Sequence, residues 1–97
     1  MTTMSDSEIQ NALAGLPAWN RSGNAIQRIF EFSDFAHAME FVNQVAAQAE
    51  EANHHPDIII NYSRVTLTLT SHDAGGLTKR DLAMARKISS LSGKAAA

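Results

Sequence analysis

The sequence predicts an α+β domain in which a four-stranded antiparallel sheet has helices packed on one face, in the order α-β-β-α-β-β-α. Apolar residues recur every three or four positions over residues 33–52, which is typical of an amphipathic helix. From Asp57 to Thr70 the apolar period changes to two, which is typical of strands. A chain of 97 residues, 44% of them apolar, is the size of one domain, so we expect residues 1–97 to form one unit with frayed ends at 1–4 and 94–97.

Composition and charge exclude several classes of protein. The net charge of −2 and the scattered Lys and Arg argue against direct binding of nucleic acid, which needs a basic patch or run. The chain has no cysteine, hence no disulfide framework and no thiolate chemistry. No apolar run approaches the ~20 residues of a membrane span, and residues 1–8 are too polar for a signal peptide. We therefore expect a cytoplasmic protein without membrane contact.

The first third of the chain predicts a short helix and a hairpin. A helix over residues 6–13 is indicated by the capping residue Ser5 or Asp6 and is closed by Pro17. Residues 18–20 form a short predicted strand, which a turn at residues 21–24 connects to a longer strand over residues 25–32.

The longest predicted helix begins after Ser33, a good N-cap, with Asp34 complementing the helix dipole. Its apolar stripe consists of Phe35, Ala38, Met39, Val42, Val45, Ala46, Ala49 and Ala52. Pro56 cannot continue a helix, so the element ends in the stretch Glu50 to Asp57.

The second hairpin follows, and we place its turn at Ser63-Arg64. The register that results pairs apolar or aromatic residues on one face: Tyr62 with Val65, Ile60 with Leu67, and Ile58 with Leu69. It also places His55 opposite His72 and brings His54 close to both at the open end of the hairpin.

The last predicted helix begins at Thr78. Thr78 and Asp81 form a capping box in which Asp replaces the usual Glu, and Leu77 and Leu82 occupy the positions of a hydrophobic staple. Its buried stripe is Leu82, Ala85, Ile88 and Leu91, and Gly93 is expected to end the helix.

Three converging histidines allow two chemical interpretations. Imidazole donates and accepts protons near neutrality, so His54, His55 and His72 could perform acid–base catalysis. Three histidines with an open position also suit zinc, although adjacent residues rarely both face one metal and no carboxylate or thiolate completes a set. The alternative without chemistry is that the first two histidines form a polar turn and the third ends a strand.

Other residues also have two interpretations. Glu50 lies one helical turn before His54 and could orient an imidazole or be solvated. Trp19 could stack on a planar ligand or belong to the core. Arg80 could meet an anion or lie on the surface, whereas Asp81 is explained by capping alone.

The spacing resembles that of the pterin-4a-carbinolamine dehydratase family. Glu50-x3-His54-His55-Pro56 is followed after five residues by Tyr62, after nine more by His72, and after eight more by Asp81. The resemblance also includes Trp19, Phe30-x-Phe32-x-Asp34-Phe35, Val45-Ala46 and Gly76-Leu77-x-x-Arg80-Asp81. It implies a small α+β domain that dehydrates 4a-hydroxytetrahydropterin to quinonoid dihydropterin, with no metal and no redox cofactor.

The resemblance also implies roles for individual residues. His54, His55 and His72 match the catalytic histidines, with the main acid and base roles at His54 and His72 in an undecided order. The positions that match the pterin pocket are Asn53, Thr70 and Ser71, with Trp19 and Asp57 as further candidates, and the supporting positions are Glu50, Pro56 and Arg80. Asn53 departs from the Asp of some members, which puts a charged contact to the pterin there in doubt. Similar proteins are homodimers or homotetramers, and in this chain the long helix or an exposed sheet edge could supply the contact.

A non-catalytic role is the competing hypothesis. Some relatives are dimerisation cofactors of a homeodomain transcription factor, and some dehydratase-like proteins are assembly chaperones that have lost the activity. Protein partners from a hydroxylase pathway or from transcription are therefore expected alternatives. Because all three histidines are present here, the resemblance favours the enzyme, a hydro-lyase in tetrahydropterin recycling.

Overall fold

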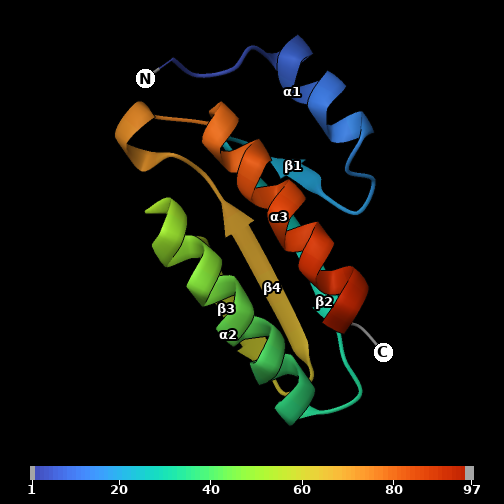
Figure 1. The fold of residues 1–97 in the computed structure, drawn as a ribbon. Helices are drawn as coiled ribbons and strands as arrows, with labels where there is room; N and C mark the ends of the chain where they lie inside the picture. Colours follow the sequence, from blue (N-terminus) through green and yellow to red (C-terminus); the bar gives the residue numbers. More distant parts are fainter. Residues whose placement is uncertain (1, 96–97) are drawn as a thin grey trace.

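The protein is a two-layer α+β domain with its helices on one face of the sheet (Figure 1). The computed structural model describes residues 2–95, with side chains up to residue 91. In chain order the elements are α1 (Asp6–Ala14), β1 (Asn20–Ser22), β2 (Ala25–Glu31), α2 (Phe35–Ala52), β3 (Asp57–Asn61), β4 (Arg64–Leu69), the 3₁₀ turn η1 (His72–Ala74) and α3 (Lys79–Ala95). This order confirms the predicted fold class.

The sheet is antiparallel throughout, with strand order β1-β2-β4-β3. The two hairpins meet where β2 pairs with β4, so these two strands are central and β1 and β3 are the edges. α2 and α3 lie side by side across one face of the sheet (Figure 1).

The core lies between these two layers. β2 contributes Ile26 and Phe30, and β4 contributes Val65, Leu67 and Leu69, all buried. From the helices come Ala38, Phe41, Val42, Val45, Leu82, Met84, Ala85 and Ile88. The predicted stripes are therefore correct in their centres, but Phe35, Ala46 and Ala52 are exposed and Phe41, absent from the prediction, is fully buried.

The predicted register of the second hairpin was wrong. Asn61 pairs with Arg64, Ile60 with Val65 and Ile58 with Leu67, so the turn is Tyr62-Ser63 rather than Ser63-Arg64. Tyr62 adopts a left-handed conformation (φ 54°) in this turn and is 69% exposed, instead of lying on the core face. The ladder ends at Asp57↔Thr68, so His55 does not lie opposite His72.

Several element ends also differ from the predictions. Trp19 precedes β1 rather than lying within a strand, and the N-cap of α2 is Asp34, not Ser33. Gly93 lies inside α3, which continues to Ala95, and residues 96–97 lie outside the described residues. Near the N-terminus, the Met4 N–H donates to the Leu77 carbonyl (2.8 Å), so the predicted loose lead-in is tied down at its last residue.

Candidate active site

Three segments meet at one end of the sheet and enclose a hollow of about 350 Å³. They are the connection from α2 to β3, the end of β4 with η1, and the beginning of α3. The lining residues are Asn53, His54, His55, Thr70, Ser71, His72, Asp73 and Arg80. The predicted meeting of the three histidines is therefore correct even though the register that suggested it was not.

The way in which α2 ends gives the two adjacent histidines different surroundings. Asn53 takes a left-handed conformation (φ 50°), which Asn tolerates better than most residues, and ends the helix. The His54 N–H then donates to the Ala49 carbonyl (3.1 Å), which turns the chain back. As a result His54 is buried and His55 is exposed.

A fully buried carboxylate holds His54. Asp81 is 0% exposed and accepts hydrogen bonds from His54 Nε2 (2.5 Å), Ser71 Oγ (2.8 Å) and the Thr78 N–H (3.0 Å). Because an ionised carboxylate only accepts, this bond fixes the His54 proton on Nε2 and leaves Nδ1 as the ring atom for other partners. The Thr78 contact is the predicted cap, and the contact to His54 is the one that the sequence interpretation missed.

The other two histidines are exposed and differ in their partners. His55 Nε2 is hydrogen-bonded to Glu50 Oε2. Glu50 therefore contacts an imidazole, but that of His55 rather than that of His54, which lies one helical turn after it in the sequence. His72 lies on η1 and makes no hydrogen bond to a side chain within the described residues. The site therefore combines one buried, oriented imidazole with two that solvent or a ligand can reach.

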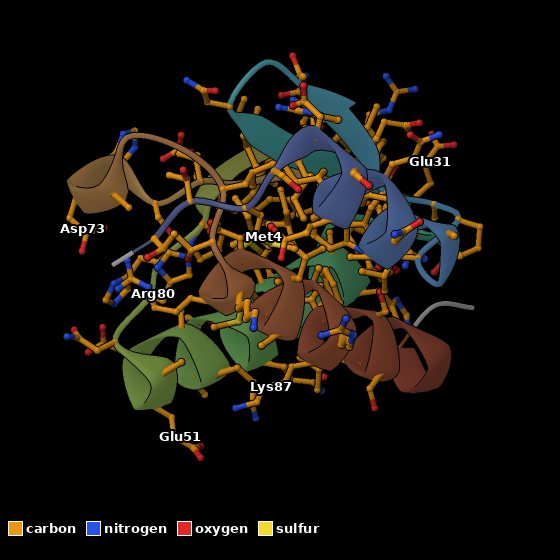
Figure 2. All side chains as sticks on the ribbon, turned by 90° about the horizontal axis from the view of Figure 1, so that it is seen from above. Met4, Glu31, Glu51, Asp73, Arg80 and Lys87 are labelled. Atoms are coloured by element: carbon orange, nitrogen blue, oxygen red, sulfur yellow. The ribbon has the colours of Figure 1, made fainter. Side chains whose placement is uncertain are left out.

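Residues 71–75, called the tip below, contain η1 with His72 and are joined to α3 by an ion pair. Arg80 Nη2 donates to Asp73 Oδ1 (2.7 Å), and this bond holds the pKa of the Asp73 carboxyl below its usual range (Figure 2). Within the tip, the Ser71 carbonyl accepts from the N–H groups of Ala74 and Gly75 (both 3.0 Å). These contacts give the loop a defined shape beside the hollow.

The remaining predicted site residues lie elsewhere. Trp19 is buried in the core, where its indole N–H donates to Ser89 Oγ (2.9 Å). Asp57 is exposed at the start of β3 and is outside the lining of the hollow, and Pro56 is buried beside it. Asp81 could have been found from sequence, since it ends the spaced motif that begins at Glu50.

Among the described residues, no three or more His, Cys, Asp or Glu side chains are placed to share a metal ion. Over residues 2–95, no helix is long and apolar enough to cross a membrane.

Three imidazoles that line one hollow of a small α+β domain form an arrangement that can transfer protons to and from a small molecule. Comparison with known proteins is more specific. The family model described as pterin 4 alpha carbinolamine dehydratase matches residues 2–91, and the chain belongs to this family.

Individual relatives cover nearly the whole chain. A protein of Koribacter versatilis, which carries the provisional name pterin-4-alpha-carbinolamine dehydratase, is 56% identical over 92% of this chain and 95% of its own. A relative in Thermomicrobium roseum with the same provisional name is 52% identical over 94% and 98%.

Solved structures share the fold. A crystal structure of a transcriptional coactivator/pterin dehydratase from Brucella melitensis has a TM-score of 0.91 and 38% identity, over 95% of this chain and 100% of that one. A pterin dehydratase-like protein identified as a RuBisCO assembly factor in the alpha-carboxysome has a TM-score of 0.67 and 26% identity, over 78% and 90%.

Proposed function

We propose that this protein is a hydro-lyase that dehydrates a 4a-hydroxytetrahydropterin to quinonoid dihydropterin and water, and that its histidines perform the proton transfers. Family membership supports the reaction class. The observation that supports catalysis by the histidines is that His54, His55 and His72 line one hollow, with Nε2 of His54 hydrogen-bonded to Asp81.

The reaction needs two proton transfers and no change of oxidation state. An acid protonates the 4a-hydroxyl, and the C4a–O bond breaks with its electron pair leaving on oxygen as water. A base removes the proton from N5 while the N5–C4a double bond forms. The acid loses one proton and the base gains one, so the protein needs two imidazoles in opposite protonation states.

We assign these two transfers to His54 and His72, in an undecided order. His54 offers Nδ1, because its Nε2 is held by Asp81. His72 is exposed and lines the same hollow from η1. His55 has its Nε2 on Glu50, which suits a role in binding or in exchanging protons with solvent. Asn53, Thr70 and Ser71 are proposed to contact the pterin, with Pro56 and Arg80 supporting the site, and Trp19 and Asp57 are the less direct candidates.

The test is the decay of freshly generated 4a-hydroxytetrahydropterin, followed by absorbance with and without the protein. Acceleration at catalytic protein concentrations is expected, with a loss of ~10²-fold or more in His72→Ala. Because His72 is exposed, this variant should fold normally. His37→Ala is the matched control, since His37 lies on α2 outside the hollow and should leave the rate unchanged. Equal rates in His72→Ala and the wild type would overturn the assignment of His72.

His54→Ala should also lose ~10²-fold in rate. Removal of this side chain takes one donor away from the buried Asp81 carboxylate, so this variant should unfold more easily, unlike His72→Ala. The activity should be insensitive to a chelator, and inhibition by EDTA that added zinc reverses would support a metal site instead.

A binding role is the second candidate, because one structural neighbour is described as a transcriptional coactivator and another as an assembly factor. A folded protein that gives no acceleration would favour that role. We also propose that the protein is a homodimer or homotetramer that works in the cytoplasm on tetrahydropterin recycling.

A further inference from the structure

We propose that a groove next to the hollow binds the substituent at C6 of the pterin and selects substrates in which this substituent ends in an anionic group. This groove, called the tail groove below, is lined by Ala52, His54, Arg80, Ala83, Met84 and Lys87. The proposal rests on the proposed function, because it assumes that a pterin occupies the hollow.

The tail groove adjoins the hollow. It lies between the end of α2 and the face of α3, and His54 and Arg80 line both spaces. A substrate whose reacting carbon lies at His54 can therefore extend a substituent along α3. The groove has a volume of about 110 Å³, roughly a third of the 350 Å³ of the hollow. That volume suits the end of a short tail rather than a second ring system.

The lining combines an apolar floor with positive charge. Ala52, Ala83 and Met84 provide the floor. Arg80 and Lys87 are seven residues apart on α3, which places them two turns apart along one face. Both lie on the side of α3 that faces α2 (Figure 2).

The two cations differ in how far their charge is compensated. Arg80 is paired with Asp73, although its buried Nε has no hydrogen-bond partner in the described structure. Lys87 takes part in none of the ion pairs among the described residues. The groove therefore has one ammonium group without an ion-pair partner among the described residues, beside a guanidinium that Asp73 already pairs, and this positive charge complements a carboxylate or phosphate better than a neutral hydroxyl group.

The test compares two stable oxidised pterins that differ by one charge-bearing group, 6-hydroxymethylpterin and its phosphate ester. Binding is followed by pterin fluorescence, a readout that does not depend on turnover. The phosphate ester should bind more tightly to the wild type. Lys87→Ala should weaken its binding roughly two- to fivefold and leave hydroxymethylpterin unchanged, since exposed ion pairs are weak. Lys87→Glu should weaken it further by repulsion.

Lys79→Ala is the matched control. Lys79 is also exposed on α3 but lines a different hollow, with Glu8 and Thr78, so its removal should not change either affinity. If Lys79→Ala rather than Lys87→Ala weakens the phosphate ester, the anion lies in that other hollow and the proposal is wrong.

A steric variant tests the groove independently of charge. Ala83→Leu adds bulk to an exposed helix position on the groove floor and should weaken the phosphate ester while hydroxymethylpterin still binds. Ala47→Leu, at an exposed position of α2 outside the groove, is the control for the substitution itself.

The outcomes separate this proposal from the proposed function. Equal affinities of the wild type for both pterins, unchanged in Lys87→Ala, would overturn the tail groove, while carbinolamine decay still decides the dehydratase activity. If neither pterin binds and decay is not accelerated, both proposals fail.

Discussion

Asp81 connects helix capping, the end of β4 and the orientation of His54 through a single carboxylate. Its partners Thr78, Ser71 and His54 come from three places in the fold and all donate to it. A buried carboxylate with this many donors is hard to replace, because an amide accepts through only one of its two terminal atoms. The residue that stabilises the start of α3 therefore also fixes which nitrogen of His54 carries the proton.

Asp81→Asn is expected to lower kcat about tenfold or more while KM changes little, because the amide NH₂ opposes a donor and His54 loses its fixed tautomer. The free energy of unfolding should fall by ~1–3 kcal/mol, the range for a disrupted buried hydrogen bond to a polar group. Steady-state kinetics and urea denaturation measure the two effects. Glu51→Gln, the same carboxylate-to-amide change at an exposed position of α2 that takes part in no ion pair among the described residues, should change neither. Wild-type kcat and pH profile in a folded Asp81→Asn protein would contradict this role.

Asp34 and His37 form a second carboxylate–imidazole pair, at the start of α2. Asp34 Oδ1 accepts from the His37 backbone N–H (2.8 Å) and contacts its Nδ1 (2.6 Å). These hydrogen bonds lower the pKa of Asp34 and raise the pKa of His37. The raised histidine stabilises the fold below its unfolded pKa, near 6.5, and this contribution is lost as pH rises through the folded value. The lowered carboxyl contributes above 3.8 and loses its contribution as pH falls through its folded value.

The pair should therefore add stability fully between about pH 4 and 6.5, and the stabilisation should shrink on either side. The difference in Tm between the wild type and His37→Gln, measured from pH 3 to 9, should be largest inside this window. A difference that stays constant with pH would contradict the ion pair, since the Asp34 cap itself remains in both proteins.

At the scale of elements, the turn of the second hairpin is strained at Tyr62. A left-handed conformation costs a residue with a bulky side chain roughly 1 kcal/mol, and Asn tolerates it better. Because the Tyr62 side chain is exposed, Tyr62→Asn should raise the free energy of unfolding by about 0.5–1 kcal/mol in urea denaturation. Tyr62→Phe keeps the strain and should match the wild type. A lower stability of Tyr62→Asn than of Tyr62→Phe would show that the ring makes a stabilising contact.

The elements could be predicted because their patterns are local, whereas the register could not. Moving the turn by one residue shifts every pairing by two, which keeps each side chain on its face. Ile60 faces the core whether it pairs with Leu67 or Val65, so the apolar pattern could not distinguish the two registers. Tyr62 misled the prediction because an aromatic residue is typical of a strand and unusual at a positive φ.

The candidate site could be predicted only in part. The sequence predicted that His54, His55 and His72 lie close together, because the start of β3 and the end of β4 lie at the same open end of the hairpin in either register. The bond between His54 and Asp81 joins residues 27 positions apart and depends on how α3 packs against the end of α2. No local pattern encodes that packing, and a capping box had already explained Asp81.

At the scale of the whole molecule, the helices cover one face of the sheet and leave apolar residues on the other. Ile29 and Ile59 are each 55% exposed, and both lie next to Thr66, one on either side of it. β3 is also an edge strand whose outer backbone groups have no strand partner within the described residues. An unpaired edge beside exposed isoleucines is a surface on which another strand readily pairs.

We therefore expect two copies to pair through β3, giving a particle of twice the 10.5 kDa of one chain in light scattering after size exclusion. Ile59→Lys should shift the mass to that of one chain, because a lysine next to a symmetry axis meets its own copy. Phe35→Ser removes the exposed phenylalanine of α2 instead and should leave the dimer intact. If Phe35→Ser dissociates the particle and Ile59→Lys does not, the long helix rather than the sheet edge joins the copies. Since the hollow is lined by residues outside β3, the dissociated Ile59→Lys chain should keep its rate of carbinolamine dehydration.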